Sequence, residues 1–240
     1  MMNTCLYGAL VMAGAFASPP ASQLAVEGVL SVPSAQYPTI QSAIDAAPDG
    51  ATVEVAPGAY FENLRLSDKP IAIVAAEGPE KTALVGHDAG PVVRIEAPEA
   101  QMVVLKGFSL RRAHPFGAEL VHAEAKNLYV VNCAFDGGSA SSGIGADVES
   151  IQLVGNAFHG GTQMVATHFA GRAEVTGNLF EDAGEARSTA QLQLPPGSEA
   201  AVARVRGNVF RTRSESDALM VPGLLDGATL HTEHNLFELR

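Results

Sequence analysis

The sequence predicts an all-β fold, a solenoid of stacked parallel strands with one short helix capping its N-terminal end. The first reason is a short phrase, a strand-like segment followed by a phenylalanine, that recurs in the second half of the chain. Its five copies end at Phe135, Phe158, Phe180, Phe210 and Phe237. The intervals of 23, 22, 30 and 27 residues are typical of one coil of a β-solenoid. We therefore expect these rings to stack in the core, with Leu110 in the same place one coil earlier.

The second reason is an asparagine that precedes the phenylalanine by two residues in four of the copies. These residues are Asn156, Asn178, Asn208 and Asn235. Stacked coils would align them as a ladder in which each amide bonds its neighbour and the turn backbone. The first copy has Asn132-Cys133 at this place, and we expect Cys133 to be a buried small residue rather than a reactive thiol.

The third observation is a single amphipathic helix early in the chain. Within residues 39–50, Thr39 is a suitable N-cap, and the apolar residues Ile40, Ala43, Ile44 and Ala47 recur at helical spacing. Pro48-Asp49-Gly50 ends the run. We expect this helix to cover the apolar end of the first coil.

Bulk composition favours one elongated β-helix domain over residues 37–240. The chain of 240 residues is 47% hydrophobic and only 17% charged, and its formal net charge is −11. Because no basic run is present, nucleic acid is an unsuitable partner. The sequence indicates no cofactor.

The N-terminal segment has the features of a secretory leader. Residues 5–17 are apolar, too short to span a membrane, and end in Ala15-Phe16-Ala17. We predict a signal peptide at 1–17, a linker with room for one short strand at 18–36, and a secreted or periplasmic location. Because no Lys or Arg precedes the apolar run, a disordered leader or a misplaced start codon is the alternative. No other segment is suited to crossing a membrane.

Period-two patterns predict the strands that follow the helix. Residues 51–60 and 62–78 form the first coil, and residues 91–112 continue the series. Each later coil adds a second strand midway between two phrases. In these strands we expect the inward side chains to be Ile144, Ala146, Val148, Met164, Ala166, Ala190, Leu192 and Leu194.

The outward side chains of the same strands form the candidate binding site. We expect a polar stripe of Asp147, Gln163, Gln191 and Gln193 on consecutive coils, with Val165 and Thr167 also outward. Uncharged amides suit sugar hydroxyls, which need both donors and acceptors. Since any solenoid has polar solvent-facing strands, the alternative is a face without a ligand.

The C-terminal end lies inside the last repeat, without a closing helix. An uncapped coil exposes unpaired backbone groups, so self-association through this end is one expectation. Blunting by Glu233, Glu238 and Arg240, or truncation relative to a longer ancestor, are the alternatives.

Residues 37–66, 71–78 and 82–86 resemble the opening of pectin methylesterases, which belong to the pectin-lyase-like superfamily of right-handed parallel β-helices. A similar opening occurs in the periplasmic β-helix proteins of copper-enzyme maturation. The resemblance implies a single-stranded right-handed parallel β-helix. It implies less about function, because many activities share this scaffold.

The esterase family's catalytic residues have no counterparts at the matching positions. After Asn132-Cys133-Ala134-Phe135, the family has Gln and an acid–base Asp where this chain has Ser139 and Ala140. One coil later, 160–165 lacks the nucleophilic Asp, and the chain contains no Trp. The resemblance therefore implies an inactive or divergent member. Asp136, just past Phe135, is a displaced acid by one interpretation and an ordinary turn residue by the other, and Asp147 is the second weak catalytic candidate.

Two further clusters of charged residues bear on metal binding and anion binding. Glu181-Asp182 and Glu185 are more typical of a solvated turn than of a calcium site, so no metal site is predicted. Arg204, Arg206, Arg211 and Arg213 crowd one coil and are the one candidate anion patch, as a lyase would need.

Three functions remain open on the sequence. The leading hypothesis is a non-catalytic or divergent β-helix that binds cell-wall glycan or serves as a surface module. The second is an active pectin esterase or polyuronate lyase with relocated catalytic residues. The third is a periplasmic assembly factor that docks a protein.

Overall fold

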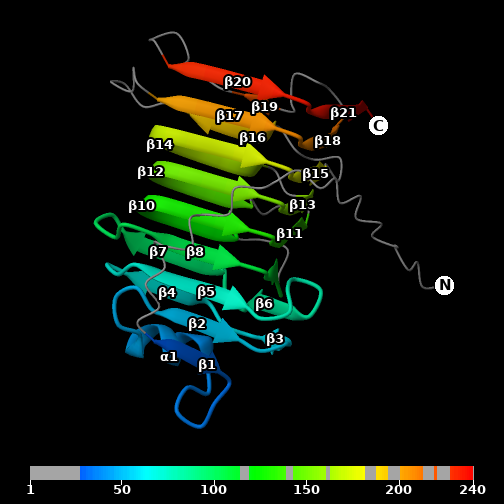
Figure 1. The fold of residues 1–240 in the computed structure, drawn as a ribbon. Helices are drawn as coiled ribbons and strands as arrows, with labels where there is room; N and C mark the ends of the chain where they lie inside the picture. Colours follow the sequence, from blue (N-terminus) through cyan, green and yellow to red (C-terminus); the bar gives the residue numbers. More distant parts are fainter. Residues whose placement is uncertain are drawn as a thin grey trace, which may run out of the picture.

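The computed structural model describes residues 28–113, 119–138, 143–160, 163–181, 188–193, 201–212, 219–220 and 228–239. Within these ranges the chain forms a right-handed parallel β-helix of about seven coils, as predicted. Its axis runs from α1 to β20 and β21 (Figure 1). The strands form three faces, which we number in the order in which each complete coil visits them.

Face 1 consists of short strands at both ends and of the first halves of three long strands in the middle. It comprises β4 (Leu64–Ser67), β7 (Val93–Ala97), β10 (Val121–Val131), β12 (Ile144–Val154), β14 (Gln163–Thr176), β16 (Ser188–Gln193) and β19 (Leu219–Met220).

Face 2 continues around the corner from face 1, and the second halves of β10, β12 and β14 belong to it. Its other strands are β1 (Val29–Val32), β2 (Thr52–Val55), β5 (Ile71–Ala75), β8 (Val103–Lys106), β17 (Val202–Arg206) and β20 (Thr229–Glu233). The short strand expected within 18–36 is β1.

Face 3 carries the phenylalanine phrase and closes each coil. It comprises β3 (Gly58–Tyr60), β6 (Thr82–Gly86), β9 (Ser109–Arg112), β11 (Ala134–Gly138), β13 (Ala157–Gly160), β15 (Leu179–Glu181), β18 (Val209–Thr212) and β21 (Leu236–Leu239).

The cap helix α1 (Ile40–Ala46) forms as predicted. The hydroxyl of Thr39 accepts from the Ser42 amide at 3.1 Å, and the Ser42 hydroxyl accepts from the Thr39 amide at 3.2 Å. Such a capping box satisfies two backbone donors that a helix start leaves unpaired. At the other end, the Lys69 ammonium donates to the carbonyls of Ile44 (2.8 Å) and Ala47 (3.0 Å). The helix buries its apolar face against the first coil.

The predicted phenylalanine stack forms beneath face 3 and is buried from Phe135 to Phe210, whereas Phe237 at its end is 41% exposed. Consecutive ring centroids from Phe135 to Phe237 lie 4.6, 4.9, 4.9 and 5.2 Å apart, with the planes within 10° of parallel. Leu110 pairs with Phe135 and is fully buried, as expected. These separations match the spacing of neighbouring strands, so strand pairing sets the ring contacts.

The asparagine ladder lies in the turn between faces 2 and 3, where each coil reverses direction. The Asn178 amide donates to the Leu153 carbonyl at 2.9 Å and to the Asn208 side-chain oxygen at 3.0 Å. Its own side-chain oxygen accepts from the backbone and side chain of Asn156, at 2.9 and 3.0 Å. Before the ladder residue, Gly155 and Gly177 take φ of +66°, which a side chain would disfavour.

Cys133 occupies the first rung of the ladder, as expected, and is buried. Its backbone amide donates to the side-chain oxygen of Asn156 at 2.9 Å. Burial raises the pKa of its thiol to about 12, although nearby backbone hydrogen bonds oppose the shift. The thiolate is the reactive form, so Cys133 is unreactive in the folded chain.

Alternation in β14 differs from the prediction. Val165 and Thr167 were expected outward and are buried, whereas Ala166 was expected inward and is partly exposed. Met164 and Val165 are both buried because the chain enters face 1 there, so the alternation restarts one residue later. The predictions for Ile144, Ala146 and Val148 are confirmed.

We predict that Asn178→Ala lowers the free energy of unfolding by about 3 kcal/mol, because it leaves the Leu153 carbonyl and the Asn156 amide buried without partners. Urea unfolding followed by circular dichroism measures the change. Asn235→Ala, at a partly exposed rung, is the matched control and should cost less. Equal stability of wild type and Asn178→Ala would contradict a structural role for the ladder.

We predict that Cys133 resists thiol reagents at about pH 8 until the chain unfolds. The experiment uses a Cys5→Ser background, in which Cys133 is the sole cysteine. Reaction with a colorimetric disulfide reagent should be complete in denaturant and slow without it. Rapid reaction of the folded chain would show that the first ladder rung opens to solvent.

Candidate functional site

One outward column of polar side chains crosses face 1. Strand register aligns one residue from each of five consecutive coils: Glu96, Glu124, Asp147, His168 and Gln193. Since neighbouring strands lie about 4.8 Å apart, the column extends over about 19 Å. We call these five residues the face-1 column.

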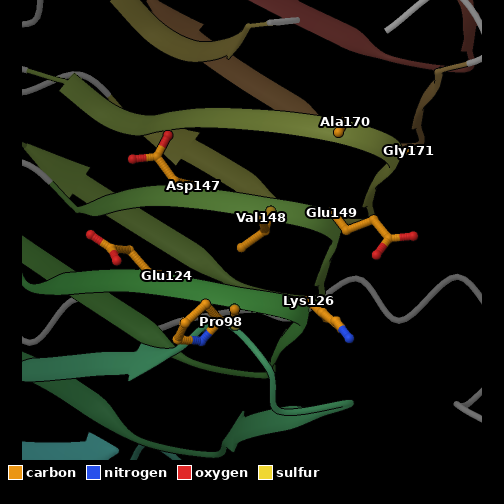
Figure 2. A pocket seen from close by; sticks show the side chains of 9 residues that line it. Pro98, Glu124, Lys126, Asp147, Val148, Glu149, Ala170 and Gly171 are labelled. Carbon is orange, nitrogen blue, oxygen red and sulfur yellow. The ribbon is translucent and has the colours of Figure 1, made fainter. Parts of the chain in front are cut away.

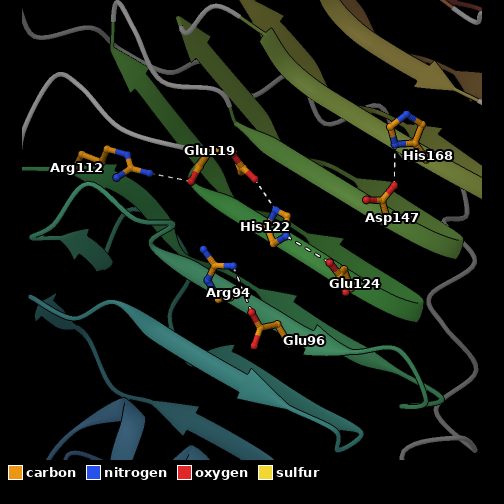
Figure 3. Close-up of polar contacts among 8 residues, drawn as sticks. All are labelled: Arg94, Glu96, Arg112, Glu119, His122, Glu124, Asp147 and His168. Atoms are coloured by element: carbon orange, nitrogen blue, oxygen red, sulfur yellow. Dashed lines mark hydrogen bonds and ion pairs between the residues drawn. The ribbon is translucent and has the colours of Figure 1, made fainter.

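Asp147 and His168 form the tightest pair of the column (Figure 3). The Asp147 carboxylate lies 2.7 Å from Nδ1 of His168, and the Gln193 side-chain oxygen lies 2.8 Å from Nε2. The Asp147 side chain is 63% exposed and that of His168 is 49% exposed. The Asp147 carboxylate and the Gln193 amide oxygen orient the imidazole together and contact both of its nitrogens.

A second histidine lies beside the column, on the strand below. Nδ1 of His122 lies 2.5 Å from the Glu119 carboxylate, and Nε2 lies 3.9 Å from the Glu124 carboxylate. The neighbouring Arg94 guanidinium contacts Glu96 at 3.3 Å (Figure 3). Three successive carboxylates of the face-1 column therefore each contact a cationic or titratable partner.

Arg112 holds the loop that leads into this region. Its guanidinium donates to the carbonyls of Asp88 (3.1 Å), Gly90 (2.5 Å) and Glu119 (2.8 Å). Burial lowers the pKa of this guanidinium, and the charges of Asp88 and Glu119 oppose the shift. Arg112 thus ties two coils together directly before Glu119 contacts His122.

A shallow groove of about 630 Å³ adjoins the column at the corner between faces 1 and 2. Glu124 and Asp147 belong to both the groove and the column. Lys126 and Glu149 line the other side, and Pro98 and Val148 lie between (Figure 2). Ala125, Ala170 and Gly171 complete the lining. The groove therefore offers an apolar strip flanked by charged side chains.

The predicted polar stripe is only partly present. Asp147 and Gln193 lie in one column, but the residue between them is His168. Gln163 lies at the start of β14, where it pairs with Ser188, and the backbone of Gln191 pairs with Ala166. Gln163 therefore lies five residues before the column position of β14, and Gln191 lies two residues before Gln193 on the same strand, so neither belongs to the column. Had the alternation of β14 been assigned correctly, the 21-residue interval from Asp147 to His168 would have predicted that the two residues lie side by side.

The other candidates lie elsewhere. Asp136 is exposed on face 3, far around the coil from Asp147, and its carboxylate accepts from the Gly138 amide at 3.2 Å, which fits the turn interpretation. The expected anion patch is wrong for the described arginines. Arg204 and Arg206 lie on face 2, whereas Arg211 lies on face 3 and bonds Glu238 at 2.7 Å. Position 213 lies outside the described residues, as do Ser139 and Ala140.

Within the described ranges, no three His, Cys, Asp or Glu side chains are placed to hold a metal ion. The described part of the chain also contains no helix long and apolar enough to cross a membrane. The face-1 column offers hydrogen-bonding groups, charges and an imidazole that a carboxylate orients.

Comparison with solved structures places this fold beside a pectin methylesterase. Two crystal structures of the Aspergillus niger pectin methylesterase, in deglycosylated and penultimately deglycosylated forms, match with TM-scores of 0.52 and 0.53. Each is 12% identical and aligns over 89% of this chain and 86% of its own. The predicted resemblance is thus confirmed at the level of fold. No family model matches the sequence. No curated protein matches it either.

We predict that Arg112→Ala lowers the free energy of unfolding by about 3 kcal/mol, because three backbone carbonyls lose a charged donor. Urea unfolding measures the loss. Arg111→Ala is the matched control, since Arg111 is adjacent and exposed and should change stability by no more than about 0.5 kcal/mol. Similar values for the two variants would show that Arg112 does not hold the loop.

Proposed function

We propose that this protein binds an uncharged cell-wall polysaccharide along the outside of face 1, without cleaving it. The observation that carries the proposal is the sharing of Glu124 and Asp147 between the groove and the face-1 column. A polymer lying along the solenoid axis would meet a polar side chain on each successive coil.

The groove has the chemical character that a sugar ring requires. Sugar rings present apolar C–H faces together with hydroxyls that both donate and accept hydrogen bonds. Pro98 and Ala170, which are both exposed, supply an apolar strip, while Glu124, Asp147 and Lys126 supply acceptors and a donor around it. Its shallowness suits an extended chain better than a small molecule that needs enclosure.

The charge of the groove favours an uncharged ligand. Three carboxylates, Glu124, Asp147 and Glu149, line it beside a single ammonium. That ammonium, on Lys126, is 3.3 Å from the carboxylate of Glu99. A polyuronate would bring further negative charge against these carboxylates, and nothing in the lining compensates for it. Methyl-esterified pectin and neutral hemicelluloses do not incur this repulsion.

The absence of cleavage is supported by the departures from the esterase pattern. An ester hydrolase of that family type needs two carboxylates with different environments beside oxyanion donors. Residues 160–165 contain no carboxylate, and Asp136 lies on face 3. The apolar segment 5–17 supports the further proposal that binding takes place outside the cytoplasm.

A second candidate function is favoured by the contact between Asp147 and His168. A carboxylate that orients an imidazole can make it a general base, as in hydrolases that activate water. Under this alternative the chain is a polysaccharide-modifying enzyme whose catalytic groups have moved to the face-1 column. Asp147 would then position His168 through Nδ1, and His168 would take the proton at Nε2 after the Gln193 side chain moves away from it.

The test combines binding and turnover on the same protein. Affinity electrophoresis through gels that contain methyl-esterified pectin, xylan or polygalacturonate measures binding. We predict retardation by the uncharged polymers and about tenfold weaker binding for Glu124→Ala/Asp147→Ala, since the carboxylates along one edge of the groove are lost. Proton release and ultraviolet absorbance of unsaturated products are followed in parallel and should stay at background.

Glu54→Ala is the control, because Glu54 is exposed on face 2 and distant from the groove. Retardation that is unchanged in the double variant would move the binding site off face 1. Proton release that Asp147→Asn abolishes would favour the enzyme over the binding protein. Retardation by polygalacturonate alone would contradict the charge argument.

A further inference from the structure

We propose that face 3 is a self-complementary surface through which two copies of this chain form an antiparallel dimer. The two-fold axis would run parallel to the strands, between β13 and β15. This inference concerns a different face from the groove and does not depend on glycan binding. Two outward columns of face 3 carry it.

The first column alternates in charge. Register aligns six residues on successive coils: Arg111, Asp136, His159, Glu181, Arg211 and Glu238. Each basic side chain is followed by an acidic one. Within the chain, His159 lies 3.0 Å from Glu181, and Arg211 lies 2.7 Å from Glu238 and 3.8 Å from Glu181.

When the order of this column is reversed, each position that held a basic side chain holds an acidic one. When a second copy faces the first with its axis reversed, Arg111 lies opposite Glu238 of the other copy. Asp136 then lies opposite Arg211, and His159 lies opposite Glu181. Because the dimer is two-fold symmetric, each pairing occurs twice. All six positions are complementary under one operation, and like charges do not meet.

The second column is mainly apolar, and reversing its order exchanges small side chains for large ones. The aligned residues are Ser109, Ala134, Ala157, Leu179, Val209 and Leu236. All are at least partly exposed, and Leu236 is 51% exposed. Three small residues are followed by three large ones, so the same two-fold axis places Ala134 opposite Val209 and Ala157 opposite Leu179. Small against large is the arrangement that lets facing sheets interdigitate.

The face-1 column does not share this property. If two copies faced each other through the face-1 column, with its order reversed about its midpoint, Asp147 of one copy would lie opposite Asp147 of the other. Two carboxylates facing each other across a sheet interface repel. On face 3, therefore, the same two-fold axis makes one column complementary in charge and the other complementary in size, although the two columns have unrelated side chains.

The expected dimer is weak. The six strands span about 24 Å, and face 3 is only three to five residues wide, so the buried area lies at the small end of specific interfaces. Exposed ion pairs contribute at most about 1 kcal/mol each. Each copy also carries a net charge of −11, which opposes association at low salt. We expect dissociation constants of about 10 to 100 μM.

Sedimentation equilibrium from about 1 μM to about 1 mM tests the proposal, a range that brackets the expected constant. Wild type should dimerise. Asp136→Arg should be monomeric, because its introduced arginine faces Arg211 of the other copy. Arg211→Asp should be monomeric for the converse reason. An equimolar mixture of the two variants should dimerise again, because each introduced charge then faces an opposite one.

The matched controls are Glu54→Arg and Arg206→Asp, which make charge changes of the same size on face 2 and should dimerise like wild type. Circular dichroism and thermal melting establish that each variant is folded. Ala157→Glu, outward in the apolar column, should also be monomeric, and it tests the interface even when a charge-reversed variant unfolds.

Monomeric wild type at every concentration would overturn the proposal. A monomeric mixture of the two folded charge-reversed variants would overturn the antiparallel register. Dimerisation of Ala157→Glu would place the interface on another surface, such as the last coil.

Discussion

The hydrogen bond from each ladder asparagine to the next coil is the interaction on which the rest of the structure depends. Each coil has to turn between faces 2 and 3, and the backbone groups in this turn have no strand partners. Asn178 and Asn208 satisfy these groups and each other at once. The same bonds fix how far one coil is rotated against the next. A coil that slipped by one residue would bury its outward residues and lose these bonds.

Fixed register has a functional consequence, because it turns single residues into columns. Asp147 and His168 come together only because the register of β12 and β14 places them opposite each other. The same constraint aligns the alternating charges and the graded apolar residues of face 3. A solenoid presents long one-dimensional patterns of this kind, which suit polymers and other long surfaces better than compact ligands.

The repeat made the fold predictable, since one coil length, one phenylalanine and one asparagine recur with little change. The cap helix followed from Thr39 and the apolar spacing after it. The site was less predictable. One irregular step between Met164 and Val165 shifted the alternation of β14, and that shift hid His168 as the partner of Asp147. Periodicity locates strands well, but phase at a corner depends on how the backbone bends, which composition does not encode.

The distribution of charge distinguishes the two faces. On face 3 the signs alternate from coil to coil, so neighbouring charges attract and the column stabilises the stack. On face 1, Glu96, Glu124 and Asp147 follow one another at strand spacing, and adjacent like charges destabilise a sheet. Partners such as Arg94 and His168 offset part of this repulsion. A solenoid selected for stability alone would alternate its charges on both faces. The glycan binding proposed above would account for the carboxylates that remain together on face 1 and beside the groove.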